Sequence, residues 1–255
     1  MSQSMQEAAA LAAHLIRASG YTVALTGAGV STPSGIPDFR SANTGLWTRN
    51  NPMEVASLSA FRNQPDKFFH WLLPLVREMS NAQPNPAHLA LARLERDGYL
   101  KAVITQNIDG LHQRAGTQNL CEVHGSLNAL TCLKCRQNYP ARDFLDSFIH
   151  HQKIPQCKAC RSALKPDIVL FEEMLPMDVW NAAQAHAEKA DLFVVIGSAL
   201  EVTPAAHLPL YALENGAKLI IITLSPTYLD PRAALLLPFD VAKVLPAIVG
   251  CLNRG

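Results

Sequence analysis

The sequence lacks three features that would assign it to a broad class at once. Its charges nearly cancel, with 22 Lys and Arg against 21 Asp and Glu, so it has no basic excess of the kind that usually marks a nucleic-acid binder. No apolar run reaches the ~20 residues of a membrane-spanning helix, and the chain does not begin with a basic region followed by an apolar core. We therefore expect an intracellular, cytoplasmic protein that binds neither nucleic acid nor membrane directly.

Cysteine is scarce, but four of the six cysteines form two C-x-x-C pairs: Cys132 with Cys135, and Cys157 with Cys160. In a reducing compartment this grouping favours a metal over disulfides. Four thiolates suit tetrahedral Zn²⁺ with no open position, which predicts a structural zinc site. A redox dithiol is the alternative, but redox enzymes rarely carry two such pairs on a lysine-rich, turn-like segment.

A complete dinucleotide fingerprint is also missing. The turn Gly27-Ala28-Gly29 follows an apolar strand, and its small residues let the backbone approach a phosphate. The third glycine of G-x-G-x-x-G falls on Thr32, however, and no acid follows about 20 residues later to hold a ribose. A hydride-transferring dehydrogenase is therefore disfavoured. The loop ends with an acid, an aromatic ring and a cation, which suit a charged small molecule that carries a ring: Asp38, Phe39 and Arg40.

Strands that alternate with helices predict an α/β fold with a mostly parallel sheet covered on both faces. We expect strands at 21–25, 102–105, 120–123, 168–171, 192–196, 218–223 and 241–244. Helices are expected at 4–19, with Ser4 and Glu7 as a capping box, and at 85–97, 142–149 and 177–189. The stretch 41–83 is helical without a strand signal, and its aromatic residues fit a core better than a ligand cage.

Three strand ends carry unusual residues: Gly27, Gln106 and Gly197. Ligands of open α/β sheets bind at the carboxyl ends of strands, so we expect these ends to converge. The amides of Gln106 and Asn107 and the acid Asp109 could bond ribose and a carboxamide, although this segment alone slightly favours a polar turn capped by Gly110. His124 lies between a strand and a glycine, the best placement among the histidines for a general base, although an average histidine is more often structural.

The stretches GAGVSTPSGIPDFR, TQNIDGLHQRAG, EVHG, the two C-x-x-C pairs, IVLFEEMLP, VIGSALEVTPA and VLPAI, in this order, resemble the sirtuin family of NAD-dependent protein deacylases over almost the whole chain. The resemblance implies a Rossmann-like NAD-binding domain made of residues 1–40, 84–126 and 169–255. It also implies a small domain, formed by the helical insertion 41–83 and the zinc-binding module 127–168. NAD and an acyl-lysine peptide would enter the cleft between them from opposite sides.

The resemblance also implies roles for individual residues. His124 would be the catalytic base, and residues 169, 171 and 172 (Val169, Phe171, Glu172) would pair with the substrate peptide. NAD would be bound at the pyrophosphate and nicotinamide ribose by Ala28, Thr32, Phe39 and Arg40, at the ribose by Gln106, and at the nicotinamide by Asn107, Ile108 and Asp109. The adenosine end would be held by Ser198, Ala199, Thr223, Leu224 and Val241.

In the mechanism that the resemblance implies, the acyl oxygen attacks the anomeric carbon of NAD, nicotinamide leaves, and an alkylimidate forms. His124 then deprotonates a ribose hydroxyl, which captures the acyl carbon. The products would be free lysine, nicotinamide and O-acyl-ADP-ribose, with zinc in a structural role.

The sequence departs from the family pattern at Ser41, Glu172, Ala199 and Thr223. Glu172 stands where a glycine is usual, and its carboxylate would favour basic peptides. The Tyr-x-x-Arg pair of desuccinylating sirtuins is absent, since Trp47-Thr48-Arg49 is the nearest analogue, so a neutral acyl group, acetyl first, is expected. Two alternatives remain: a mono-ADP-ribosyltransferase that uses the same pocket, and a zinc-containing NAD sensor without catalysis.

Overall fold

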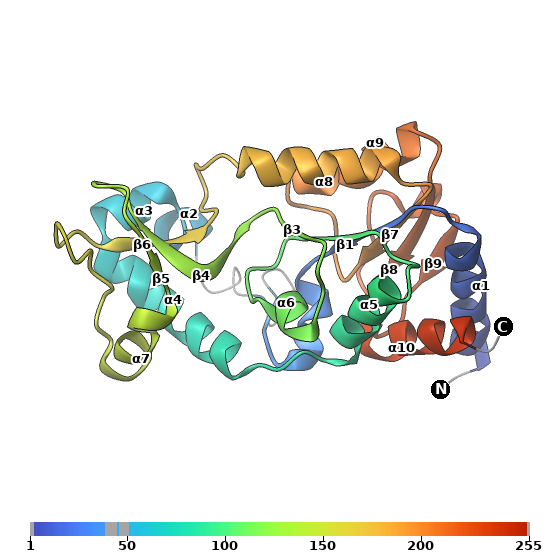
Figure 1. Cartoon of the computed structure of the whole chain (residues 1–255), viewed down its shortest axis with the longest axis horizontal. Coiled ribbons are helices and arrows are strands. Elements are labelled where there is room, and N and C mark those ends of the chain that lie inside the picture. Colours follow the sequence, from blue (N-terminus) through green and yellow to red (C-terminus); the bar gives the residue numbers. More distant parts are fainter. Residues whose placement is uncertain (1–2, 39–44, 46–50, 254–255) are drawn as a thin grey trace.

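Six parallel strands form the main sheet of the computed structural model, which describes residues 3–38, 45 and 51–253 (Figure 1). The strand order is β3-β2-β1-β7-β8-β9. Neighbouring strands are parallel at every pairing, which confirms the predicted parallel α/β sheet. The strands are β1 (Thr22–Thr26), β2 (Ala102–Thr105), β3 (Leu120–Glu122), β7 (Leu192–Ile196), β8 (Lys218–Ile222) and β9 (Leu235–Leu237).

Helices cover both faces of this sheet. One face packs against α1 (Gln3–Ala18), α5 (Pro86–Arg96) and α10 (Val241–Leu252), and the other against α8 (Met177–Lys189) and α9 (Leu208–Glu214). Side chains alternate between the two cores along β7: Val194 and Ile196 face the first, whereas Phe193 and Val195 face the second. A strand buried on both faces needs such a continuous apolar run, which is why LFVVI was recognisable in the sequence.

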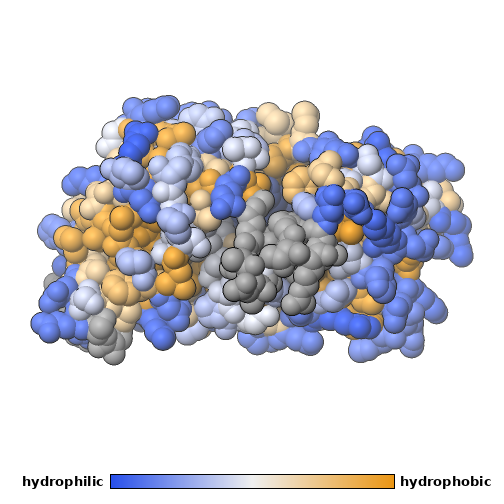
Figure 2. All heavy atoms as spheres, turned by 180° about the vertical axis from the view of Figure 1, so that it is seen from behind, coloured by the Kyte–Doolittle hydropathy of each residue, from blue (hydrophilic) through white to orange (hydrophobic). Residues whose placement is uncertain are grey.

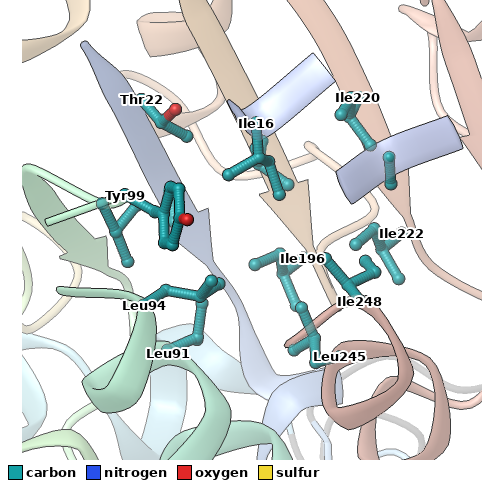
Figure 3. Close-up of a pocket in the computed structure, with 14 residues that line it drawn as sticks. Ile16, Thr22, Leu91, Leu94, Tyr99, Ile196, Ile220, Ile222, Leu245 and Ile248 are labelled. Carbon is teal, nitrogen blue, oxygen red and sulfur yellow. The ribbon is translucent and has the colours of Figure 1, made fainter. Parts of the chain in front are cut away.

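The first core contains a small void that is lined mainly by aliphatic side chains. In Figure 3, Ile16, Ile196, Ile220 and Leu245 point toward one another across it. Its volume of about 10 Å³ is at the lower limit for one water molecule, and its exposed lining is apolar. This void is a packing feature of the core and not a ligand site.

A second, antiparallel sheet has the order β5-β4-β6 and is formed by β4 (Gly125–Cys132), β5 (Asn138–Pro140) and β6 (Leu164–Ile168). It lies with α7 (Arg142–His151) at the end of the molecule away from the termini (Figure 1). The helical insertion, α2 (Pro52–Val55), α3 (Leu58–Asn63) and α4 (Pro65–Asn81), packs there too. One core joins Phe61, Phe68 and Phe69 of the insertion to Phe148 of α7 and Ile168 of β6, so these three insertion aromatics form a core, as predicted.

Three of the expected elements differ from the structure. Residues 241–244 begin α10 and not a strand, because the Asp240 side chain accepts a hydrogen bond from the Ala242 amide and caps a helix. The strand expected at 168–171 is β6, which ends at Ile168 and pairs antiparallel with β4. Ser4 lies inside α1 and does not cap it.

The end of the molecule that carries the small sheet is mainly hydrophilic on the face drawn in Figure 2. Figure 2 shows hydrophilic side chains predominating at that end of the displayed face, whereas hydrophobic ones gather toward the end that carries the termini. Both C-x-x-C turns contribute exposed cations, Lys134 and Arg136 from one, and Lys158 and Arg161 from the other. Within the described ranges, no helix combines the length and apolarity that a membrane crossing requires.

Candidate functional site

A cleft of about 700 Å³ lies between the carboxyl edge of the main sheet and the small sheet with its helices. This volume falls within the ~300–1,000 Å³ typical of small-molecule pockets. Its walls bring together many of the predicted site residues from distant parts of the chain: Ala28, Gln106, Asn107, Ile108, Asp109, His124, Val169, Phe171 and Glu172.

The glycines at the ends of β1 and β7 allow two backbones to touch. The Gly29 amide donates a hydrogen bond to the Gly197 carbonyl over 2.9 Å. A Cβ atom on Gly29 would lie 2.8 Å from that carbonyl oxygen, and one on Gly197, whose φ is +59°, would lie 2.4 Å from the Val30 nitrogen. Any side chain at either position would push the two loops apart. The neighbouring Gln106 side chain donates to the Ser198 hydroxyl over 3.1 Å, so the three predicted strand ends do converge.

Hydrogen bonds to the turn after the glycine loop hold two of the residues predicted for the nicotinamide pocket. Ser31 is buried, and its hydroxyl donates to the Asp109 carboxylate over 2.7 Å. The Asn107 amide donates to the same hydroxyl over 3.0 Å and to the Gly27 carbonyl over 3.1 Å. Asp109 also accepts from the Leu111 amide, at the start of α6 (Leu111–Ala115). These bonds orient Asn107 and Asp109 at the wall of the cleft.

Two fully buried histidines lie beneath this network. The rings of His88 and His112 are 4.8 Å apart, centre to centre. His88 Nε2 is 3.4 Å from the Ser31 hydroxyl, and His112 Nε2 is 3.0 Å from the Thr26 hydroxyl. Burial lowers the pKa of His88 to about 4, although the charge of Asp109 acts in the opposite direction. Burial, assisted by the neighbouring His88, lowers the pKa of His112 to about 3, so both rings are neutral at pH 7.

His124 follows β3 at the rim of the cleft and is half-buried. Its Nδ1 atom lies 3.0 Å from the backbone carbonyl oxygen of Gln106. A carbonyl oxygen can only accept, so this contact places the proton on Nδ1 and the lone pair on Nε2. An imidazole held in this tautomer is suited to act as a general base.

Gly125 is required next to His124 because β6 passes very close to it. The residue has a φ of +72°, and a Cβ atom would lie 2.1 Å from the Asp167 carbonyl oxygen. Directly after β6, Val169 donates its amide to the His124 carbonyl over 2.8 Å. The H-G pair therefore joins the main sheet to the small sheet at the cleft.

An unusual carboxylic acid lies two residues before His124. Burial raises the pKa of Glu122 to about 7, and the negative charge of Asp109 contributes in the same direction. Its carboxyl group accepts a hydrogen bond from the Gln113 side chain over 2.9 Å. Glu122 is therefore partly protonated near neutral pH.

Residues 169–173 line one wall of the cleft, and we call them segment 169–173. Phe171 bridges to Ser57 in parallel, donating its amide to Ala56 and accepting from the Leu58 amide. Glu172 has a φ of +74°, a conformation that favours glycine. Its carboxylate accepts hydrogen bonds from the amide and the hydroxyl of Ser59, at 2.9 and 2.7 Å. These bonds lower the pKa of the exposed Glu172 carboxyl, and the charge of Arg62 adds to the effect.

The four cysteines of the C-x-x-C pairs converge at one point, with all sulfur atoms within 4.8 Å of one another. The Cys132–Cys160 and Cys135–Cys157 sulfur atoms are 3.4 and 3.5 Å apart. A disulfide requires about 2.0 Å, whereas sulfurs bound to one tetrahedral zinc at ~2.3 Å lie close to 3.8 Å apart. The cluster therefore fits a Cys₄ zinc site.

The residues predicted for the adenosine end lie outside the lining of the cleft: four of them follow β7 and β8, and the fifth begins α10. Ser198 is buried, Thr223 is half-buried and Leu224 is 76% exposed. Val241 is the first residue of α10, and its side chain belongs to the core. Thr32 and Asp38 belong to the described part of the loop, with Thr32 exposed and bonded to the Gly29 carbonyl. Phe39, Arg40, Ser41 and Trp47-Thr48-Arg49 lie outside the described residues.

The sequence did not single out His88, Glu122 or Lys165. A signal existed for His88, because Asn85-Pro86 starts a helix and places this histidine third, where its ring completes a capping box with Asn85. Lys165 and Glu122 gave no such signal, because the Glu173 partner of Lys165 and the Gln113 partner of Glu122 come from outside the strands that carry them.

Comparisons with known proteins agree with this geometry. The model of the "Sir2 family" matches residues 27–204. The NAD-dependent protein deacylase 2 of Archaeoglobus fulgidus is 44% identical over 251 residues, 98% of each chain. The NAD-dependent protein deacetylase of Thermotoga maritima is 41% identical over 229 residues, 90% of this chain and 92% of that protein.

Solved structures are similar to the same extent. A chain described under the structural basis for the mechanism and regulation of Sir2 enzymes has a TM-score of 0.91 at 43% identity, covering 98% of this chain and 99% of its own. Sir2 with a p53 peptide and NAD⁺ has a TM-score of 0.86 at 38% identity, covering 95% and 97%. Sir2Tm bound to a propionylated peptide has a TM-score of 0.85 at 38% identity, with the same coverage.

Proposed function

The chain belongs to the Sir2 family, and we propose that His124 is the general base of its reaction, with NAD and an acyl-lysine peptide meeting in the cleft. The protein is an NAD-dependent protein-lysine deacylase, which transfers the acyl group to ADP-ribose and releases nicotinamide. The predicted resemblance to sirtuins is thereby confirmed. When bound, NAD supplies the electrophilic ribose carbon and the nicotinamide leaving group.

One contact supports the role of His124 most directly: its Nδ1 atom is held by the Gln106 carbonyl. Nε2 then has the lone pair needed to take a proton from a hydroxyl. Because Gln106 also bonds Ser198, the same residue that orients the base contacts the loop at the end of β7.

The nicotinamide pocket is proposed at Asn107, Ile108 and Asp109. Ser31 and the Gly27 carbonyl fix the Asn107 amide, and Ser31 also fixes the Asp109 carboxylate. A carboxamide has both donors and an acceptor, so an amide and a carboxylate that are already oriented can bind it without further ordering. The fit of NAD to this chain is supported by these oriented groups and by the cleft volume of about 700 Å³.

For the rest of NAD, we propose the glycine loop and the ends of β7 and β8. The backbone approach at Gly27, Gly29 and Gly197 supports this assignment, as does the neighbouring Ser198. The other proposed contacts are Ala28, Thr32, Asp38, Phe39, Arg40, Gln106, Ala199, Thr223, Leu224 and the backbone of Val241.

The peptide is proposed to bind along segment 169–173. This segment lines the cleft, and its first residue, Val169, is bonded to the backbone of His124. An extended peptide that adds itself as a strand here would bring its acyl-lysine toward the base. A neutral acyl group, acetyl first, remains the proposed substrate.

Zinc is proposed to be held by Cys132, Cys135, Cys157 and Cys160 in a structural role. Four thiolate ligands leave no open coordination position for a substrate. Cys157 and Cys132 are fully buried, next to Leu130 and Leu164. The metal therefore replaces a hydrophobic core that this small sheet is too short to build alone.

We also propose the division into a NAD-binding domain (1–40, 84–126, 169–255) and a small domain (41–83, 127–168). It is supported by separate cores: two on the faces of the main sheet, and one shared by the helical insertion, α7 and β6. A cytoplasmic location is proposed because a reducing compartment keeps the four zinc ligands as thiolates.

The comparisons do not favour the mono-ADP-ribosyltransferase, and the intact His124, Asn107 and Asp109 favour deacylation. The test is an assay of an acetyl-lysine peptide with and without NAD, with the products followed by mass. Deacetylated peptide and acetyl-ADP-ribose should form only with NAD. ADP-ribose attached to protein, without deacetylation, would instead establish the transferase, and NAD binding without any turnover would point to a sensor.

A further inference from the structure

Lys165 is a buried lysine outside the proposed catalytic and NAD-binding residues. It lies on β6, opposite Thr131 of β4, and its side chain is only 9% exposed. Lysine is almost never buried to this extent without partners, because an unpaired ammonium in a protein interior is very costly. Its position therefore requires compensating contacts.

Each of the three N–H groups of the Lys165 ammonium has an acceptor. Nζ lies 2.9 Å from the Glu173 carboxylate, 2.9 Å from the Pro166 carbonyl and 2.8 Å from the Ile168 carbonyl. All three acceptors belong to the chain that directly follows Lys165. The Lys165 ammonium therefore holds the end of β6 and segment 169–173 together.

Glu173 extends this arrangement to the segment backbone. Its carboxylate oxygen that meets Lys165 also accepts the Leu170 amide over 2.9 Å, while the Glu173 amide donates to the Leu170 carbonyl over 3.1 Å. Glu173 lines the cleft and is 21% exposed. Residues 170–173 therefore form a turn that is closed by the bonds between Leu170 and Glu173. The Glu173 carboxylate holds this turn to the Lys165 ammonium.

The same segment is bonded to the proposed base. The Val169 amide donates to the His124 carbonyl over 2.8 Å, between the Ile168 and Leu170 residues that the Lys165–Glu173 pair fixes. A shift of this segment would therefore change where a bound peptide lies relative to His124.

We infer that Lys165 is a positioning residue for the peptide substrate: its ammonium, with Glu173, sets the conformation of residues 169–173 in which an extended peptide binds. This inference rests on the proposed function, in which that segment binds the peptide. A buried ion pair contributes little net stability compared with well-packed apolar side chains, so fold stability alone is a weak reason for this one.

The test compares Lys165→Met with the wild type on two substrates. One is a peptide with residues on both sides of its acetyl-lysine, which contacts the segment, and the other is acetyl-lysine blocked at both ends, which has no neighbouring residues. Methionine keeps an unbranched apolar chain close to the stem of lysine but removes the ammonium group and its charge. The matched control is Lys153→Met, at an exposed lysine of the same small domain.

We expect Lys165→Met to raise the KM for the long peptide about tenfold, while kcat/KM for the blocked acetyl-lysine and the KM for NAD stay within about twofold. Lys153→Met should leave both substrates unchanged. Equal losses on both substrates would assign Lys165 a structural role only, and an unchanged long-peptide KM would also overturn the inference.

Glu173→Gln provides a second variant in case Lys165→Met does not fold. It keeps an acceptor for the Leu170 amide but removes the charge that faces Lys165, so the long-peptide KM should rise, by less than in Lys165→Met. Failure of this inference is distinct from failure of the proposed function. Wild-type turnover of the blocked acetyl-lysine tests the deacylase assignment with a substrate that has no neighbouring residues to contact the segment.

Discussion

The Nδ1 atom of His124 lies 3.0 Å from the backbone carbonyl oxygen of Gln106, the residue that directly follows β2. This bond joins the proposed base to the neighbouring parallel strand, next to Asn107 of the nicotinamide pocket. Because the acceptor is a backbone atom, no side-chain substitution at residue 106 removes it. The tautomer of His124 is therefore fixed by the backbone at the end of β2.

Substituting His124 with alanine should reduce deacylation by about 10²- to 10⁴-fold, the usual contribution of a general base. The imidazole is half-buried and outside the cores, so the melting temperature should change little. Initial rates with an acetyl-lysine peptide would be measured beside NAD binding by calorimetry. Retention of most of the activity would refute the assignment, provided that the variant still binds NAD.

Protonation of the two buried histidines should destabilise the protein in acid. Their pKa values fall from 6.5 in the unfolded chain to about 4 and about 3 in the fold, so the unfolded state binds more protons between those limits. Stability is then fully present above pH 6.5 and is lost as the pH falls. Glu122 acts in the opposite direction: its folded pKa of about 7 exceeds 4.5, so its contribution is lost as the pH rises through that range.

The measurement is the free energy of unfolding in urea at pH 6.5 and pH 5, for the wild type and for His112→Gln. Glutamine keeps a polar group near Thr26 but does not titrate. The wild type should lose about 2 kcal/mol more than the variant over this interval, at 1.36 kcal/mol per pKa unit. Equal losses would mean that burial does not keep His112 neutral in the folded protein.

Removing one zinc ligand should unfold the small sheet. Cys157 is fully buried, and Cys157→Ser would leave three thiolates around the metal. We expect zinc content to fall well below one per chain and the melting temperature to fall by on the order of 10 °C. Cys251→Ser, a thiol outside the cluster, is the control and should keep its zinc. A Cys157→Ser protein with unchanged zinc content and stability would argue against the site.

Glu172 should respond differently to alanine and to glycine. Alanine loses the bonds to Ser59 and keeps the unfavourable φ of +74°, whereas glycine loses the same bonds but adopts that φ freely. Glu172→Ala should therefore melt at a lower temperature than Glu172→Gly. The reverse order would show that the backbone conformation at residue 172 does not limit stability.

The same pair of variants tests whether the Glu172 charge selects substrates. Ser59 uses part of the carboxylate, but the group is exposed and its pKa is lowered, so it stays negative. Both variants should lose some preference for basic over acidic residues beside the acetyl-lysine, measured as a ratio of kcat/KM values. An unchanged ratio would leave Glu172 with the structural role alone.

Much of the main sheet could be predicted because its strands are buried on both faces. β2 and β7, and the helix α8, have the predicted bounds. The convergence of Gly27, Gln106 and Gly197 followed from the parallel sheet, since parallel strands end at one edge. The assignment of 241–244 to a strand was wrong because a stretch as short as Val-Ala-Lys-Val does not distinguish a strand from the start of a helix.

The sequence by itself determined the family, the parallel sheet, the four cysteines proposed to bind zinc and the residues proposed for the cleft, because each of these depends on local spacing or on a short motif. Only the tertiary structure decided which carbonyl holds His124 and that His88 and His112 lie together, neutral, beneath Ser31. It also decided that Lys165 binds Glu173 and thereby holds segment 169–173. Those relations join side chains to partners across strands and loops. Their energies come from burial and from distance, and neither quantity is defined until the chain has folded.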